Sequence, residues 1–259
     1  MKRFWTFVKR ITGKVKGSSV PDLEVQRGYT RTTVSSDAEK ANALNKHFAE
    51  PTHLENCPKT FPDLPHPSQF SPDSFSTTSS EVYDTLTALK SGKAPGLDEL
   101  PPKLLSLCAR GIATSLCALY NRSFSEGRVP SPWKEALVIP VFKSGATTNP
   151  SNYRPIALLS IVSKVMEKIV LKRLNTFLDP LISPKQSGFR RNDGTTQQLT
   201  RLIQEWSVAL DASHLVGVVF FDFKKAFDCV HLPALLLKLK AAGLQGKALL
   251  WCESFLTDR

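Results

Sequence analysis

The chain has 259 residues, 41% of them hydrophobic, which is enough to bury the core of one large domain or two modest ones. Its 34 Lys and Arg residues outnumber its 23 Asp and Glu residues, and a net charge of +11 suits a polyanionic partner such as nucleic acid, or simply a solubilising surface. Five scattered cysteines with no C-x-x-C pair argue against a disulfide framework, a disulfide-linked partner or a zinc knuckle, and fit an intracellular, reducing compartment. No apolar run approaches the about 20 residues of a membrane span, and the N-terminus lacks the apolar core of a signal peptide.

Residues 1–72 read as a basic N-terminal extension and linker ahead of a main domain at 73–259. Residues 1–16 carry six Lys and Arg and no acid, which is compatible with a basic amphipathic helix that touches RNA or a membrane surface, with a transit peptide, or with a solvated terminus. Residues 17–36 read as a polar linker. Apolar positions at helical spacing then predict a helix over Ser36–Ala49, and the proline-rich stretch 51–72 predicts a second linker.

Two helices and a turn open the main domain. A helix is predicted from Ser80 to the Ser91-Gly92 pair, and a longer core helix over Leu104–Phe124, ended by Gly127. Between them stands the turn Lys93–Asp98, which reads K-A-P-G-L-D. On its residues alone this turn is an ordinary helix–helix connection.

A β-hairpin with a cation on each side follows. Strands are predicted over Ala136–Phe142 and from Tyr153 to Leu159, joined by a polar tip that begins at Lys143. Such a hairpin can fold over a triphosphate, because Lys143 supplies a point charge and Arg154 a fork of donors matched to phosphate oxygens. Two solvated charges that flank a turn are the alternative.

A basic helix and a short motif come next. The helix predicted over Ile161–Leu178 has a Lys- and Arg-rich outer face, which could lie along a nucleic-acid backbone or simply face solvent. The motif Q-S-G-F-R-R follows at Gln186–Arg191. Its glycine permits close backbone approach, Phe189 offers a stacking face, and Arg190 offers a phosphate contact.

The segment Val216–Asp228 reads V-G-V-V-F-F-D-F-K-K-A-F-D and follows a helix predicted over Thr195–Leu210. Its apolar, β-branched and aromatic run predicts a strand buried on both faces that ends at Asp222. A carboxylate there is costly unless it is paired, and a divalent cation is one such partner; capping of the next turn is the other interpretation. Two more helices are predicted, at about Pro233–Ala242 and Gln245–Phe255.

Four of these blocks, in this order, resemble the reverse transcriptases of non-LTR (LINE-type, jockey-like) retrotransposons. The blocks are K-A-P-G-L-D, I-P-V-F-K-S-G with N-Y-R-P-I, Q-S-G-F-R, and F-D-F-K-K-A-F-D. The family typically has proline at Leu97, glycine at Glu99 and serine at Ala157. The resemblance implies an α+β, helix-rich right-hand polymerase fold, of which this chain would hold the fingers and the first part of the palm.

The resemblance also implies a role for three residues of the last block. Asp222 would bind the catalytic Mg²⁺, with possible help from the Phe223 carbonyl. Phe227 would lie under the incoming sugar and reject the 2′-hydroxyl.

The second and third blocks would bind the nucleotide. Lys143 and Arg154 would grip the triphosphate. Arg190 would be a further binding residue, supported by Gln186 and Phe189.

The reaction that the resemblance implies is RNA-directed DNA synthesis by two-metal nucleotidyl transfer to a primer 3′-hydroxyl. Its partners would be an RNA template, a DNA primer and deoxynucleoside triphosphates, in the nucleus and cytoplasm. No Y-A-D-D or F-A-D-D pair occurs in the sequence, so Asp222 lacks the acidic partners of the metal site, and we expect the chain by itself to be inactive. A nucleic-acid-binding remnant without chemistry, and a product that never folds stably because its palm sheet is incomplete, are the alternatives.

Overall fold

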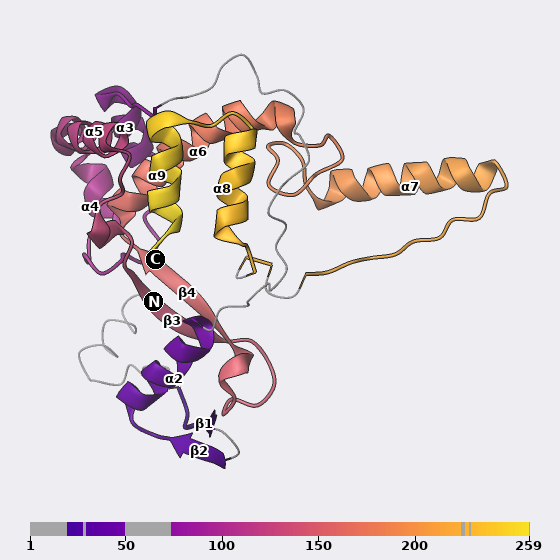
Figure 1. The fold of residues 1–259 in the computed structure, drawn as a ribbon, viewed down its shortest axis with the longest axis horizontal. Helices are drawn as coiled ribbons and strands as arrows, with labels where there is room; N and C mark the ends of the chain where they lie inside the picture. The colour runs from indigo at the N-terminus through magenta and orange to yellow at the C-terminus, as the bar shows by residue number, and fades with distance from the viewer. Residues whose placement is uncertain (1–19, 28–29, 50–73, 224–225, 228, 259) are drawn as a thin grey trace, which may run out of the picture. The chain divides into compact units, whose positions relative to one another are not determined.

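The computed structural model describes residues 20–27, 30–49, 74–223, 226–227 and 229–258 (Figure 1). These residues fall into two compact units. Unit 1 takes its residues from Met1–Pro51 and Leu137–Leu158, and unit 2 from Thr52–Ala136 and Leu159–Arg259. The predicted features at 1–16 and 51–72 lie outside the described residues, and a domain boundary at residue 72 stays a prediction.

Unit 1 contains a small sheet that the sequence did not reveal. Strand β1 (Leu23–Arg27) pairs antiparallel with β2 (Thr30–Val34), with Leu23 opposite Val34. Helix α2 (Asp37–Ala49) follows, as predicted. The prediction of a linker over 17–36 was therefore wrong. Leu23 and Val25 alternate along β1 and, with Val34 at the end of β2, pack in a small core with Leu44 of α2.

The predicted hairpin is confirmed. Strands β3 (Ala136–Phe142) and β4 (Tyr153–Leu159) form a two-stranded sheet, with the short 3-10 helix η2 (Pro150–Asn152) in the connection. The Lys143 amide donates to the Asn152 carbonyl at 2.8 Å and closes the end of the ladder.

Unit 2 is helical in its described part. Its helices are α3 (Ser79–Thr87), α4 (Pro102–Leu107), α5 (Ala109–Glu126), η1 (Ser131–Trp133), α6 (Ile161–Leu178), η3 (Asp179–Leu181), α7 (Thr195–Asp211), α8 (Leu232–Ala241) and α9 (Gly246–Leu256). The predicted helix over 161–178 is confirmed at both ends. The predicted helix over 104–124 is two helices, because the backbone at Cys108 takes a ψ of 0° and the Gly111 amide bonds back to the Cys108 carbonyl, three residues away, as in a tighter turn.

The core of unit 2 lies among α3, α5, α6 and α9, which pack together in Figure 1. The Phe75, Phe124 and Trp251 rings meet edge to face with centroids 5.7–5.9 Å apart. The buried Tyr120 hydroxyl donates to the Val162 carbonyl at 2.8 Å, which ties α5 to α6, and burial raises the pKa of Tyr120. Gly127 ends α5 with a φ of +66°, a conformation that glycine adopts at little cost.

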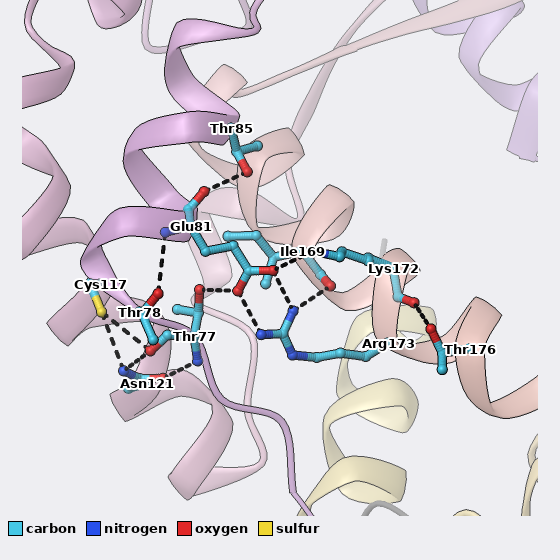
Figure 2. A network of polar contacts seen from close by, with 10 residues as sticks. All are labelled: Thr77, Thr78, Glu81, Thr85, Cys117, Asn121, Ile169, Lys172, Arg173 and Thr176. Carbon is cyan, nitrogen blue, oxygen red and sulfur yellow. Dashed lines mark hydrogen bonds and ion pairs between the residues drawn. The ribbon is translucent and has the colours of Figure 1, made fainter.

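A polar network also joins α3, α5 and α6 (Figure 2). The Asn121 side chain accepts from the Thr77 amide at 2.8 Å and donates to the Thr77 carbonyl at 2.9 Å. The Thr78 hydroxyl accepts from the Glu81 amide and caps α3. The Glu81 carboxylate in turn faces Arg173 of α6.

The strand predicted over Val216–Phe221 is wrong. Residues 215–223 lie in extended chain with no β-partner among the described residues, and the Phe220 and Phe221 side chains are 80% and 87% exposed. Helix α7 just before them contributes no buried residue. Composition predicted burial, but a strand exists only where a neighbour accepts and donates its backbone hydrogen bonds. In the part of the chain that the structure describes, no helix is long and apolar enough to cross a membrane.

Candidate functional site

The β3–β4 hairpin brings two of the predicted site residues to one end. Lys143 directly follows β3, and Arg154 is the second residue of β4. Strand alternation buries Tyr153 and exposes the next residue, Arg154. Neither Lys143 nor Arg154 forms an ion pair with any residue that the structure describes. Two exposed cations without acidic partners can therefore bind an anion at this end of the hairpin.

Hydrogen bonds order the connection between the strands. The Asn149 side chain accepts from the Ser151 amide at 2.9 Å, and the Asn152 side-chain amide donates to the Ala146 carbonyl at 2.8 Å. Gly145 has a φ of +94°, and a Cβ atom there would approach the Asn152 side chain to 2.7 Å. Sequence reasoning treated these residues only as a polar tip, although Asn and Gly at a strand connection are the usual turn-forming residues.

A polar cavity of about 440 Å³ lies beside this connection. Arg31 of β2 and Lys46 of α2 line one part of it, and Asn149 and Ser151 line another. The N-terminal segment, which also contributes Glu24, and the hairpin connection thus line one polar cavity within unit 1.

In unit 2 the structure brings Phe189 of the Gln186–Arg191 motif against Phe227. The rings of Phe189 and Phe227 meet edge to face, with centroids 6.1 Å apart and an interplanar angle of 87°. Gln186 donates from its side chain to the Gly188 carbonyl at 3.2 Å and so stabilises the turn of the motif. The two aromatic residues singled out from separate motifs therefore contact each other.

Arg190 is engaged within its own unit. Its Nη1 atom lies 3.2 Å from Asp179 Oδ1 and also donates to the Asp179 carbonyl at 3.2 Å. To contact a phosphate, this guanidinium would use its remaining donors or leave Asp179.

Asp222 and Phe223 lie in the exposed extended segment, so the predicted setting of Asp222 at the end of a buried strand is not observed. The described residues contain no group of three or more His, Cys, Asp and Glu side chains that could hold a metal ion. One carboxylate and one carbonyl are too few for the two-cation site that the resemblance implies, so the described donors do not fit it. Asp228 lies outside the described residues.

Gly96 of the K-A-P-G-L-D turn has a structural role that the sequence did not reveal. A Cβ atom at Gly96 would lie 2.5 Å from the Leu159 carbonyl carbon and 2.5 Å from the Ser160 nitrogen. The turn therefore packs directly on the backbone where β4 passes into α6. The Pro-Gly pair signals a turn, but its neighbour is set by tertiary packing.

Comparisons with known proteins define the class. Residues 141–259 match the family described as "Reverse transcriptase (RNA-dependent DNA polymerase)". The matched range contains all the predicted site residues, namely Lys143, Arg154, Arg190, Asp222, Phe223 and Phe227. Residues 141–259 therefore form part of a reverse transcriptase domain, whose right-hand fold is consistent with the mixture of helix and sheet observed.

The relatives come from non-LTR retrotransposons. Over 96% of its length the chain is 31% identical to the RNA-directed DNA polymerase from mobile element jockey of Drosophila melanogaster, of which it spans 28%. It is 29% identical, over 79% of its length, to the probable RNA-directed DNA polymerase from transposon BS of the same fly, of which it spans 24%. It is also 33% identical, over 69% of its length, to a putative 115 kDa protein in type-1 retrotransposable element R1DM, of which it spans 17%. The chain thus corresponds to a part of such polymerases.

Proposed function

We propose that the chain supplies the fingers and the start of the palm of an RNA-directed DNA polymerase that copies an RNA template from a DNA primer. The observation that carries this proposal is the end of the β3–β4 hairpin, where Lys143 and Arg154 are exposed and without acidic partners among the described residues. The end of β3, the connection and β4 lie within the range that matches the reverse transcriptase family.

The hairpin would bind the triphosphate of the incoming deoxynucleotide. Arg154 would donate two parallel hydrogen bonds to phosphate oxygens, and Lys143 would add a compact positive charge. The same two charges would stabilise the negative charge that develops on the departing pyrophosphate.

The loop after residue 222 would contribute the other groups. Phe227 would select the deoxyribose, and its contact with Phe189 supports this role because the ring is then held from one side. A divalent cation, when bound, would neutralise the phosphates, with Asp222 and the Phe223 carbonyl as ligands. Since these donors do not complete a site, we propose that the isolated chain does not extend a primer.

Equilibrium binding of a fluorescent deoxynucleoside triphosphate tests whether Lys143 and Arg154 bind the triphosphate. Lys143→Ala and Arg154→Ala should each weaken binding about tenfold or more, since a hydrogen bond to a charged group contributes about 1.5–3 kcal/mol. Arg122→Ala is the control, because Arg122 is an exposed cation of α5 that pairs with Glu126 at 2.8 Å. Equal affinities for all four proteins would contradict the proposal.

Primer extension tests the predicted inactivity. The purified 259 residues, an annealed RNA template with a DNA primer, all four deoxynucleotides and Mg²⁺ should give no product above background. Incorporation that is lost in Asp222→Ala would show that the chain has the missing ligands after all.

A nucleic-acid-binding protein without chemistry is the second candidate, and the charge distribution favours it. Lys164, Lys168 and Lys172 repeat every four residues along α6, and the first two have no ion-pair partner among the described residues. Unit 1 also carries 12 of the 34 Lys and Arg residues but only five of the 23 Asp and Glu residues. RNA binding that weakens steeply with salt, yet is indifferent to Mg²⁺ and to Asp222→Ala, would support this candidate.

A further inference from the structure

We infer that residues 20–27 and 30–49, here called the brace, fix the β3–β4 hairpin for triphosphate binding, and that Tyr153 is the positioning residue through which the brace acts. This inference rests on the proposed function of Lys143 and Arg154. The sequence placed residues 20–49 outside the main domain, whereas the structure packs the brace against the hairpin within unit 1.

Tyr153 is the point of attachment. Its side chain is 7% exposed and lies in one small core with Leu23 of β1, Val34 of β2 and Leu44 of α2. Its hydroxyl donates to the Thr147 carbonyl at 2.7 Å, and its ring meets the Phe142 ring edge to face at 5.6 Å. A single side chain therefore contacts the brace, the connection and the opposite strand of the hairpin.

The position of Tyr153 couples this core to the cations. Arg154 is the next residue, and successive side chains of a strand point to opposite faces, so fixing the Tyr153 ring inward fixes Arg154 outward. Phe142, which the Tyr153 ring contacts, immediately precedes Lys143. The two binding residues thus each adjoin one member of an aromatic pair.

A backbone contact and a buried lysine fasten the brace. The Glu24 amide of β1 donates to the Thr148 carbonyl of the connection at 2.8 Å. Lys40 of α2 is buried, donates to the Val20 carbonyl at 3.0 Å and lies 3.1 Å from Asp22, so the segment that enters β1 is tied to α2. Strand β1 is thereby held between the helix and the hairpin connection.

The consequence concerns preorganisation. A two-stranded hairpin is marginally stable by itself, and a ligand that must order it loses affinity. A hairpin held by the brace presents both cations at a fixed separation, which suits a chain of phosphates more than a single phosphate. Loosening the brace should therefore weaken triphosphate binding more than monophosphate binding.

Two variants of the full chain test this, with a third as control. Leu44→Ala removes a brace side chain that touches neither cation, and Tyr153→Phe keeps the ring but loses the hydroxyl. Leu105→Ala is the matched control, because Leu105 is buried in the core of unit 2. Two quantities are measured: amide hydrogen exchange of residues 143–154, and the dissociation constants of a deoxynucleoside triphosphate and its monophosphate.

We expect Leu44→Ala to speed exchange across residues 143–154 and to weaken triphosphate binding about tenfold, with monophosphate binding changed by less than about twofold. Tyr153→Phe should speed exchange and weaken triphosphate binding to about a third of that extent. Leu105→Ala should change neither the exchange of residues 143–154 nor the triphosphate affinity. If Leu44→Ala unfolds unit 1, Tyr153→Phe decides the matter.

If the amide exchange of residues 143–154 is unchanged in both Leu44→Ala and Tyr153→Phe, the inference that the brace fixes the hairpin is wrong. Faster exchange with unaltered triphosphate affinity would overturn the positioning role. If the wild-type chain binds no triphosphate while amide exchange still responds to Leu44→Ala, triphosphate binding by Lys143 and Arg154 is refuted, and the exchange data alone support the brace. The failure of the proposed function can therefore be told apart from the failure of this inference.

Discussion

Glu81 of α3 and Arg173 of α6 form a pair joined by two parallel hydrogen bonds. Arg173 Nη1 donates to Glu81 Oε1 at 3.0 Å and Nη2 donates to Oε2 at 2.6 Å. Arg173 Nη1 also donates to the Ile169 carbonyl, and the Thr77 hydroxyl donates to Glu81 Oε2 at 2.8 Å (Figure 2). Hydrogen bonds from Arg173 and then Thr77 hold the pKa of the Glu81 carboxyl below its usual value of 4.5, against the opposing effect of burial.

Glu81→Gln should lower the free energy of unfolding by about 2 kcal/mol at pH 7, because the charge-assisted hydrogen bonds to Arg173 are lost. The folded pKa of Glu81 is lowered, so its contribution is fully present above the unfolded pKa and is lost as the pH falls through the folded value. Urea unfolding at several pH values should therefore show the difference between wild type and variant shrinking below about pH 4.5.

The control for this prediction is Glu126→Gln. Glu126 pairs with Arg122 one turn earlier on the exposed face of α5, and such pairs contribute little. A loss as large in Glu126→Gln as in Glu81→Gln would contradict the special role of the α3–α6 pair.

Gly96→Ala should destabilise unit 2 by about 1–3 kcal/mol, because its methyl group would overlap the backbone at Leu159 and Ser160, which cannot move aside as a flexible side chain would. Thermal or urea unfolding measures the effect. Gly111→Ala is the control with the opposite expected sign. Apart from its chain neighbours and the backbone of its own helix α5, no atom lies within 4 Å of its Cβ position, so alanine should stabilise by about 0.5–1 kcal/mol. Equal effects would show that the close approach at Gly96 is absent.

The cysteines should differ sharply in reactivity. Cys252 is buried in α9, and burial raises its pKa to about 12, whereas Cys108 is exposed between α4 and α5. Because the thiolate is the reactive form, an aromatic disulfide reagent at pH 8 should label Cys108 quickly and Cys252 only after unfolding. Peptide mass spectrometry identifies the labelled residues. Labelling of Cys252 at the rate of Cys108 in folded protein would contradict its packing beside Trp251.

The exposed segment 215–223 should make the chain associate with itself. It is apolar, free of proline and nearly uncharged, which is the composition of segments that pair with other extended chains. Val219→Lys should shift the protein toward monomer in sedimentation velocity. Leu107→Lys also replaces an exposed apolar residue, at the end of α4, and should have no such effect. Indifference to both substitutions would contradict the prediction.

The features that the sequence predicted well are those with local causes. The hairpin strands and α6 begin and end where apolar periodicity and turn residues indicate. Lys143 and Arg154 reach the same end of the hairpin because antiparallel pairing across a polar connection leaves no other arrangement. The edge-to-face contact of Phe189 with Phe227 could not be derived locally, since it joins residues 38 positions apart through a loop.

The failures have physical causes of a different kind. In β1 the alternation of Leu23 and Val25 with polar residues is only five residues long. The residues on either side are mostly polar, so the sequence predicted a linker there instead of a strand. No glycine or proline marks the break at Cys108, so nothing in the sequence interrupts the helical pattern. At Val216–Phe221 the side chains favour burial, but the strand also needs partners that the described residues do not provide.

Phe189 has a φ of +62°, in a left-handed region where a side chain with a Cβ atom is disfavoured by about 1–2 kcal/mol. Asparagine or glycine would relax the backbone there, but neither has a ring to place against Phe227. The ring of Phe189 therefore meets Phe227 from a backbone conformation that its own Cβ atom disfavours, so backbone relaxation and this aromatic contact make opposite demands on one residue.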